Sequence, residues 1–326
     1  MKGLEEETEY FESRLSEALR GGFGEVLAYV RGGKRLRPLI CILAAEAVGG
    51  DREDALPAAI AIELVHNASL IHDDIIDENT VRRRAPTAFA EHGKKAIILG
   101  DMLFALSCGM LARCGSEVMA LVSKAVLDIA VGQYMEFSLR HAENASEDDY
   151  IRVAELKTAS SFAASAEAGA VLGGGGEAEI RRLREFGRML GIAYQIQDDV
   201  IDILGDPDAE TPPGLDIRNG EKTIVVIHAL NRASREEREF ILKSLSRGRV
   251  DADTLLKMRK LLTDLGSIKY SLDLFTEFIE KAKACLDPLE ETDAKRRLAK
   301  RKLLRIPDVI AEKLESAVRA AGVRAE

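Results

Sequence analysis

Two short acidic segments have the residue types and the spacing of a metal-binding site. Residues 71–77 read IHDDIID and residues 196–202 read IQDDVID, so both follow the pattern I-x-D-D-[IV]-I-D. On an ideal helix, the three aspartates of each segment share an arc of about 100°. Carboxylates without His or Cys co-ligands suit Mg²⁺ or Mn²⁺, and Mg²⁺ keeps water and phosphate oxygens in its shell. The predicted ligands are Asp73, Asp74, Asp77, Asp198, Asp199 and Asp202.

A solvated helix face is the alternative interpretation of such a cluster, and it is the usual one for a single charge run. Here the pattern occurs twice with matching apolar neighbours, such as Ile75 and Val200. Apolar flanks indicate partial burial, and like charges in a buried setting are unfavourable without a counter-charge. The sequence therefore favours metal binding.

Basic residues supply a complement to these carboxylates. Residues 32–38, GGKRLRP, place three cations on a glycine-led turn before a predicted helix, and Arg82, Arg83 and Arg84 follow the first acidic segment. Either cluster alone is typical of a solvated loop. Beside metal-binding carboxylates, such a turn and such arginines predict a site for substrates that carry a diphosphate.

The elements that must position these residues are all predicted to be helices. Apolar residues recur every three or four positions in a dozen segments, and no segment alternates like a strand. The segments lie near 4–20, 36–48, 54–77, 95–113, 116–141, 148–172, 177–204, 221–231, 235–247, 251–263, 267–286 and 308–320. Short connections favour one all-α domain over residues 1–326 rather than two domains. The four glycines at 173–176 lack the Lys-Ser/Thr of a P-loop and predict a hinge or a helix terminus.

Composition narrows the class of protein. With 326 residues, 46% of them hydrophobic, and a net charge of -9, we expect a globular chain without an overall nucleic-acid-binding surface. Four scattered cysteines predict reduced thiols in a cytoplasmic protein. The most apolar stretches, 38–48 and 96–106, fall short of the roughly 20 residues that span a bilayer. We therefore expect no transmembrane segment, with transient contact to a membrane surface left open.

From about residue 30 to about residue 230, the chain resembles the trans-prenyltransferases, also called isoprenyl diphosphate synthases or polyprenyl synthetases. The resemblance rests on ordered motifs: GGKRLRP at 32–38, ELVHNASLIHDDIIDENTVRRRAPT at 63–87, GDMLFA at 100–105, GQ at 132–133, KTAS at 157–160 and FGRMLGIAYQIQDDVIDILGD at 186–206. It implies a single-domain bundle of antiparallel helices around a deep central cavity, usually a homodimer, with the two aspartate motifs facing each other across the cavity mouth.

The resemblance also implies roles for individual residues. The six aspartates would hold Mg²⁺ at the diphosphate of an allylic substrate. The pocket for isopentenyl diphosphate would be formed by Lys34, Arg37, His66 and Arg83. Arg82 would contact the allylic diphosphate, and the developing carbocation would be met by Lys157, Thr158 and Gln195. His66 falls within about 20° of Asp73 on a helix, although a core histidine is the alternative.

These roles imply a mechanism based on charge. Cleavage of the allylic C–O bond creates a diphosphate anion and an allyl cation, so fixed cations around the leaving group stabilise the transition state. The double bond of isopentenyl diphosphate then attacks, and loss of a proton to the released diphosphate leaves a chain five carbons longer. The cavity must exclude water, which would quench the cation.

Several positions depart from the family pattern. Arg84 stands where glycine is usual, Glu210 and Thr211 replace a Gly-Lys pair, and Glu221 shifts a second lysine to Lys222, which we expect to serve in diphosphate binding. Residues 287–326 form a divergent helical extension that contains the basic run 295–305. That run could close over the site, dock on anionic lipid or be a solvated helix, and the last is favoured.

Product length in this family depends on the residues one turn before the first motif. Here they are Ala68 and Ser69, both too small to end chain growth early, which predicts a product of C20 or longer. Three other functions are weighed. A terpene cyclase would not need the second full motif together with GGKRLRP, and a ligand-free bundle leaves six clustered carboxylates unexplained. A non-catalytic subunit of a heteromeric synthase is the main alternative, because Thr211 and Glu221 weaken one cation contact.

Overall fold

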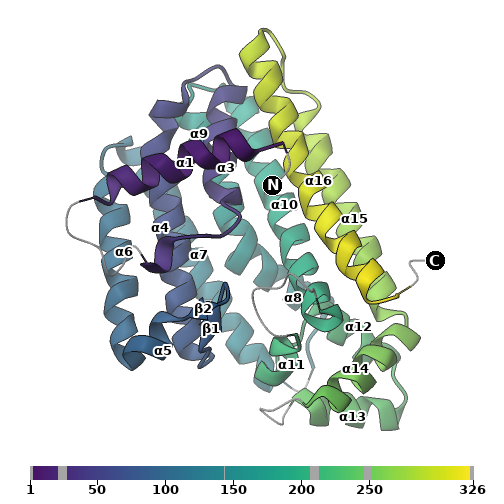
Figure 1. Ribbon diagram of the computed structural model, residues 1–326. Helices are drawn as coiled ribbons and strands as arrows, with labels where there is room; N and C mark the ends of the chain where they lie inside the picture. The colour runs from purple at the N-terminus through teal and green to yellow at the C-terminus, as the bar shows by residue number, and fades with distance from the viewer. Residues whose placement is uncertain (1–2, 21–27, 143, 206–212, 246–250, 324–326) are drawn as a thin grey trace. The chain divides into compact units, whose positions relative to one another are not determined.

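The computed structural model describes residues 3–20, 28–142, 144–205, 213–245 and 251–323. In this part of the chain the protein is almost entirely helical, which confirms the predicted all-α class (Figure 1). The helices are α1 (Glu5–Ala18), α3 (Leu36–Ala47), α4 (Arg52–Ile76), α5 (Ala88–His92), α6 (Ala96–Leu111), α7 (Gly115–His141), α8 (Glu147–Ala154), α9 (Ser160–Leu172), α10 (Glu177–Leu204), α11 (Leu215–Asn219), α12 (Ile224–Arg232), α13 (Arg235–Leu245), α14 (Ala252–Asp264), α15 (Ser267–Leu286) and α16 (Ala294–Ala320).

Three shorter elements were not expected from the sequence. A hairpin of two-residue strands, β1 (Val81–Arg82) and β2 (Ala85–Pro86), lies in the segment predicted to be a loop. A 3₁₀ turn, η1 (Gly93–Lys95), precedes α6, and a π-helical turn, η2 (Glu155–Ala159), interrupts the helix predicted over 148–172. Two-residue strands are too short to show an alternating pattern, and a single π turn leaves the apolar period almost unchanged. The glycines at 173–176 separate α9 from α10, as predicted.

The chain forms two compact units, each built from three stretches of sequence. Unit 1 comprises Met1–Leu127, Ser160–Arg188 and Ala282–Val309. Unit 2 comprises Asp128–Ala159, Met189–Lys281 and Ile310–Glu326. Four of the five boundaries fall inside the helices α7, α10, α15 and α16. The single domain over residues 1–326 stays a prediction.

The core of unit 1 is built around α3, α4 and α9. Helix α4 packs against α3, α6 and α9, and α3 packs against α9 (Figure 1). Almost every residue of α3 is buried, as is most of the first two thirds of α4, because both are apolar on nearly all faces. Close approach of α3 and α9 requires glycine at position 169, where a Cβ would lie 2.0 Å from the carbonyl oxygen of Cys41. This packing fixes α4, which carries the first aspartate motif.

The basic run 295–305 forms the first half of α16, which begins earlier than the sequence predicted and continues through Pro307. Several of its cations pair within unit 1. Arg296 lies 3.1 Å from Glu179, and Lys302 pairs with Glu7 of α1. The prediction of a solvated face is therefore wrong for these positions, because both cations are partly buried. Their ion pairs attach α16 to neighbouring helices of unit 1.

Among the described residues, two helices are long and apolar enough to cross a membrane by length and composition alone, so the expectation of no transmembrane segment stays a prediction. They are Arg52–Ile76, which is α4, and Gly115–His141, which is α7. In α4, 72% of the apolar window is buried, as expected of a core helix, whereas only 22% of that in α7 is buried. The apolar surface of α7 therefore requires another explanation.

Candidate active site

The first aspartate motif occupies the C-terminal end of α4 in unit 1. Asp73 and Asp74 lie in its last turn, and Asp77 directly follows the helix. Asp74 is only 3% exposed, and its carboxylate accepts hydrogen bonds from Arg82 Nη2 at 2.8 Å and Arg82 Nε at 3.0 Å. Its charge is thus compensated by the arginine that we predicted to bind diphosphate. Asp73 and Asp77 are half-buried, and the negative end of the helix dipole adds to their attraction for a cation.

The arginines that follow this motif form the turn of the β1–β2 hairpin. Arg83 and Arg84 have φ angles of 52° and 59°, the left-handed conformations that a two-residue type I′ turn requires. The guanidinium of Arg83 lies against Gly33, where an added Cβ would be 2.7 Å from Nη2. The structure therefore brings Arg83 beside the glycine-led turn that precedes Lys34, as the predicted pocket requires.

Arg37 and His66 meet in the same unit. Arg37 donates from Nε to Ser161 Oγ at 2.8 Å, and its Nη1 lies 3.3 Å from His66 Nε2. Burial, together with the charges of the four arginines 37, 83, 82 and 35, holds the pKa of His66 well below its usual value. A neutral ring can accept from Arg37, which agrees with that contact. Arg35 and Arg82 are paired with carboxylates, so the positive charge that could attract an anion beside this neutral histidine comes from Arg37 and Arg83.

The two positions predicted to set product length lie one turn before the motif. Ala68 is fully buried, and Ser69 is half-buried with its hydroxyl donating to the carbonyl of His66 at 2.8 Å. Both side chains are small, and Ser69 turns its only polar group back on its own helix. Neither position holds a large side chain, as the prediction of a long product requires.

The second motif occupies the last two turns of α10, in unit 2. Asp199 is 2% exposed; its Oδ1 accepts from Gln195 Nε2 at 2.8 Å, and its Oδ2 has no hydrogen-bond partner among the described residues. Burial, aided by the charge of Asp198, raises the pKa of Asp199 to about 7. Burial also raises the pKa of Asp202 to about 6, although backbone N–H groups donate to its carboxylate. Burial thus outweighs the hydrogen bonds to both carboxylates and the charge of Arg218 beside Asp202.

A further carboxylate, which the sequence did not single out, adds to this negative charge. Asp216 in α11 donates its backbone N–H to Asp202, and burial with the charge of Asp202 raises its pKa well above the usual value. It belongs to the GLD sequence at 214–216, within the segment compared with the family pattern, so that segment could have pointed to it.

Lys157 and Thr158 are presented by the π-helical turn η2. Two glycines permit this: a Cβ at Gly132 of α7 would lie 2.4 Å from the backbone nitrogen of Lys157, and one at Gly191 of α10 would lie 2.4 Å from Cα of Ala159. Both gaps are too small for any side chain. The GQ motif at 132–133 thus provides the close approach that places the turn, and π turns occur frequently at functional sites.

A chain of hydrogen bonds links this turn to the second motif. Thr158 Oγ1 donates to Gln195 Oε1 at 2.5 Å, and Gln195 Nε2 donates to Asp199 Oδ1. Since Asp199 fixes the amide of Gln195, the hydroxyl of Thr158 donates its proton to Gln195 Oε1. All three predicted catalytic residues lie in unit 2, and two of them, Thr158 and Gln195, take part in these hydrogen bonds.

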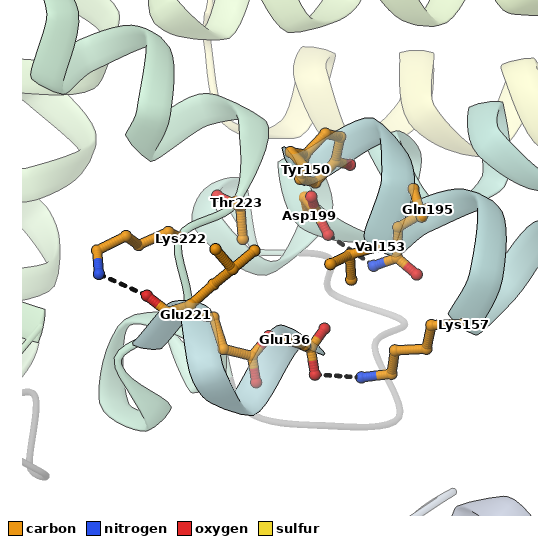
Figure 2. A pocket seen from close by; sticks show the side chains of 11 residues that line it. Glu136, Tyr150, Val153, Lys157, Gln195, Asp199, Glu221, Lys222 and Thr223 are labelled. Carbon is orange, nitrogen blue, oxygen red and sulfur yellow. Dashed lines mark hydrogen bonds and ion pairs between the residues drawn. The ribbon is translucent and has the colours of Figure 1, made fainter. Parts of the chain in front are cut away.

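A pocket in unit 2 gathers most of these groups (Figure 2). It encloses about 410 Å³, counting the open space at its mouth. It is lined by Glu136, Leu139, Tyr150, Val153, Ala154, Lys157, Gln195, Asp199, Glu221, Lys222 and Thr223. Lys157 Nζ pairs with Glu136 at 2.5 Å, and Tyr150 is buried with its pKa raised by that burial and by Asp199. Sequence reasoning missed Glu136 and Tyr150, because neither belongs to a motif with recognisable chemistry.

Lys222 is engaged at the end of α7. Its Nζ donates to the carbonyl oxygens of Leu139 at 2.6 Å, Arg140 at 3.1 Å and Ala142 at 2.6 Å. A cation at a helix C-terminus is stabilised by the unpaired carbonyls there. In this arrangement the lysine caps α7, and its role in diphosphate binding stays a prediction. Glu210 and Thr211 lie outside the described residues.

The donor atoms of each motif are of the kind that binds a divalent ion. No group of three or more His, Cys, Asp or Glu side chains arranged to hold a metal occurs within the described ranges. The donors are carboxylates at the negative ends of two long helices, one of them with an orphaned buried oxygen. Such open carboxylate sites suit an ion that completes its shell with water and phosphate oxygens.

Comparison with known proteins identifies the family. The family model for polyprenyl synthetase matches residues 23–262. The chain belongs to the polyprenyl synthetase family. The family uses divalent metal ions for diphosphate binding.

Two relatives and one solved structure show how far the similarity extends. A short chain isoprenyl diphosphate synthase from Methanothermobacter thermautotrophicus is 37% identical over 275 residues, covering 82% of this chain and 84% of that protein. A geranylgeranyl diphosphate synthase from Methanosarcina mazei is 35% identical over 272 residues, covering 81% and 82%. The crystal structure of a polyprenyl synthase from Caulobacter crescentus, complexed with calcium and isoprenyl diphosphate, matches with a TM-score of 0.86 at 28% identity, covering 95% of this chain and 96% of that one.

Proposed function

We propose that this polyprenyl synthetase condenses an allylic diphosphate with isopentenyl diphosphate, head to tail, to make an all-trans polyprenyl diphosphate. The observation that carries the proposal is the pair of aspartate motifs at the C-terminal ends of α4 and α10, with Asp199 and Asp202 of the second motif buried so that their pKa values are raised. The motif order and the prenyl diphosphate synthases among the relatives support the same reaction.

In this mechanism the residues of each unit have separate tasks. Arg37, Arg83 and neutral His66 bind isopentenyl diphosphate, and Arg82 neutralises Asp74 while remaining close to the first motif. Asp73, Asp77 and the second motif would hold Mg²⁺, which when bound supplies positive charge that stabilises the leaving diphosphate. Thr158, oriented through Gln195, would present its hydroxyl oxygen near the allyl cation.

A condensation assay tests the proposal. Purified protein is incubated with Mg²⁺, labelled isopentenyl diphosphate and an allylic primer, and the products are identified by mass spectrometry. Chain elongation supports the proposal. Absence of turnover that is relieved by a related chain would instead support the non-catalytic subunit, a role disfavoured because both motifs retain all their aspartates.

A product of C20 or longer follows from the small side chains at positions 68 and 69. Relatives named geranylgeranyl and geranylfarnesyl diphosphate synthase support this length. Replacing Ser69 by Phe is expected to shorten the main product by at least one five-carbon unit, because the ring would fill space one turn before Asp73. Leu70→Phe, turned about 100° away on the helix, is the matched control. If Ser69→Phe makes the same product as the wild type, position 69 does not set the product length.

We further propose a cytoplasmic homodimer. On α7, the side chains of Leu127, Val131, Tyr134 and Phe137 are between 41% and 75% exposed. Their spacing of three and four residues places them along one side of the helix, and a large apolar surface of this kind is typical of an interface. A subunit interface explains why α7 has the hydropathy of a membrane-spanning helix.

Replacing Tyr134 by Glu is expected to weaken the dimer, because it places a charge in an apolar interface. Light scattering would then report the mass of a monomer at a concentration where the wild type has the mass of a dimer. A wild type that is monomeric and binds anionic vesicles would favour membrane contact for this surface instead.

A further inference from the structure

Glu63 and Asn67 lie one turn apart on α4, and both side chains are almost completely buried, with exposures of 2% and 1%. Asn67 Nδ2 donates to Glu63 Oε1 at 3.0 Å and to the carbonyl oxygen of Glu63 at 2.7 Å. Both amide protons are therefore directed toward Glu63. The amide oxygen of Asn67 must face the other way, because the reversed amide would lose both bonds.

Glu63 fixes the backbone next to Lys34, which is predicted to bind isopentenyl diphosphate. It accepts a hydrogen bond from Arg35 Nη1 at 2.5 Å, and Arg35 also donates to Val30 O at 2.7 Å and to Glu12 at 2.6 Å. The side chain of Arg35 has no exposed surface, and its backbone has the left-handed φ of 52°. A non-glycine residue keeps this conformation only where its surroundings fix it. The contacts of Arg35 provide that constraint.

Asn67 fixes Arg83 in the turn of the β1–β2 hairpin, the second place where the backbone is left-handed. Its Oδ1 accepts from Arg83 Nη1 at 3.3 Å, and the same nitrogen donates to the carbonyl of Arg31 at 3.2 Å. Arg83 also has a φ of 52° and packs against Gly33. One face of α4 thus holds the glycine-led turn through Glu63 and the hairpin arginine through Asn67.

We propose that Asn67 is a positioning residue for isopentenyl diphosphate, acting through Arg83. The inference rests on the proposed function, in which Arg83 contacts that substrate. Asn67 needs no contact with the substrate itself: it holds the guanidinium in place before binding, so that less ordering is required when the diphosphate arrives. Binding of the allylic substrate does not depend on the contact between Asn67 and Arg83.

Replacing Asn67 by Leu keeps a similar shape but removes every hydrogen bond. The KM for isopentenyl diphosphate is expected to rise about tenfold, the effect of one lost hydrogen bond to a charged group. The KM for the allylic primer should change less than twofold. Asn67→Asp retains an oxygen facing Arg83 and should keep the KM for isopentenyl diphosphate near that of the wild type, although repulsion from Glu63 lowers its melting temperature. Glu12→Gln, which alters Arg35 without touching Asn67 or Arg83, is the control.

A double-mutant cycle separates positioning from a merely structural role. If Asn67 acts through Arg83, then Asn67→Leu adds no further rise in the KM for isopentenyl diphosphate in an Arg83→Ala background. The proposal would be overturned if the rise in this KM for the double variant equalled the product of the rises for the two single variants. It would also be overturned if Asn67→Leu raised the KM of both substrates equally. A wild type that condenses no isopentenyl diphosphate rejects the proposed function, whereas an active wild type with an unaffected Asn67→Leu variant rejects this inference alone.

Discussion

Asp199→Asn is expected to lower kcat by about three orders of magnitude while it stabilises the metal-free protein. The activity falls because a carboxylate of the second motif is lost where charge develops in the transition state, an effect typical of removing one such group. The stability rises because Asp199 is buried with an orphaned oxygen and beside other carboxylates. Asparagine can still accept the hydrogen bond from Gln195 through its own oxygen.

The stabilisation should depend on pH. The pKa of Asp199 is raised from 3.8 to about 7 in the folded protein. The folded state therefore binds more protons than the unfolded chain between these values, and the contribution of this group to stability falls as the pH rises through that range. Because a tenfold difference in proton affinity between the two states corresponds to about 1.4 kcal/mol, the variant should gain a few kcal/mol at about pH 8 and almost nothing at about pH 4.

Thermal unfolding in EDTA at both pH values, with kcat measured in Mg²⁺, checks this prediction. The exposed Asp148→Asn of α8 is the control and should change neither quantity. A variant that loses activity and stability together would mean that Asp199 supports the fold. A variant that keeps its activity would remove the second motif from the mechanism.

Gly132→Ala is expected to lower kcat about a hundredfold, although it adds only one methyl group outside the aspartate motifs. The methyl carbon would lie 2.4 Å from the backbone nitrogen of Lys157 and 2.8 Å from its Cα, so the π turn must move. A displacement of about 1 Å near reacting groups is sufficient for such a loss. Overpacking of this kind should also destabilise the protein by about 1–3 kcal/mol.

Gly109→Ala on α6 is the matched control, because nothing lies within 4 Å of its Cβ position. It should leave kcat unchanged and stabilise the protein by about 0.5–1 kcal/mol, the usual gain for this change inside a helix. Steady-state kinetics and denaturant unfolding of the two variants distinguish them. Equal kinetic effects from both substitutions would show that the close approach at Gly132 has no special role.

The parts of the fold that were predictable from sequence are those with a long or repeated pattern of residue types. Helical periodicity placed α4 and α10 nearly correctly, and the duplicated aspartate pattern located the ends of both. The arginines and histidine at 37, 66 and 83 were expected together, and the structure joins Arg37 with His66 and surrounds that histidine with arginine charge. The helices and the duplicated motif depend on local sequence, whereas the grouping of Arg37, His66 and Arg83 was implied by the resemblance to the family.

The features that were missed depend on tertiary partners. The pairing of Asp74 with Arg82, the capping of α7 by Lys222 and the approach of Gly132 to Lys157 each join segments that no periodicity connects. The π turn is invisible because one extra residue scarcely alters an apolar period. The start of α16 was set too late although Ala299, Leu303 and Ile306 continue its buried apolar face, because the dense basic charges of this half, which distant carboxylates satisfy, obscured that pattern.

The central claim is that both aspartate motifs bind divalent ions that hold an allylic diphosphate. A crystal structure with Mg²⁺ and a non-cleavable allylic diphosphate analogue tests it most directly. We expect ions bridging the analogue to carboxylates at Asp73 or Asp77 and at Asp198, Asp199 or Asp202, with the hydrocarbon tail directed past Ser69. An analogue bound with either motif free of metal would contradict the account.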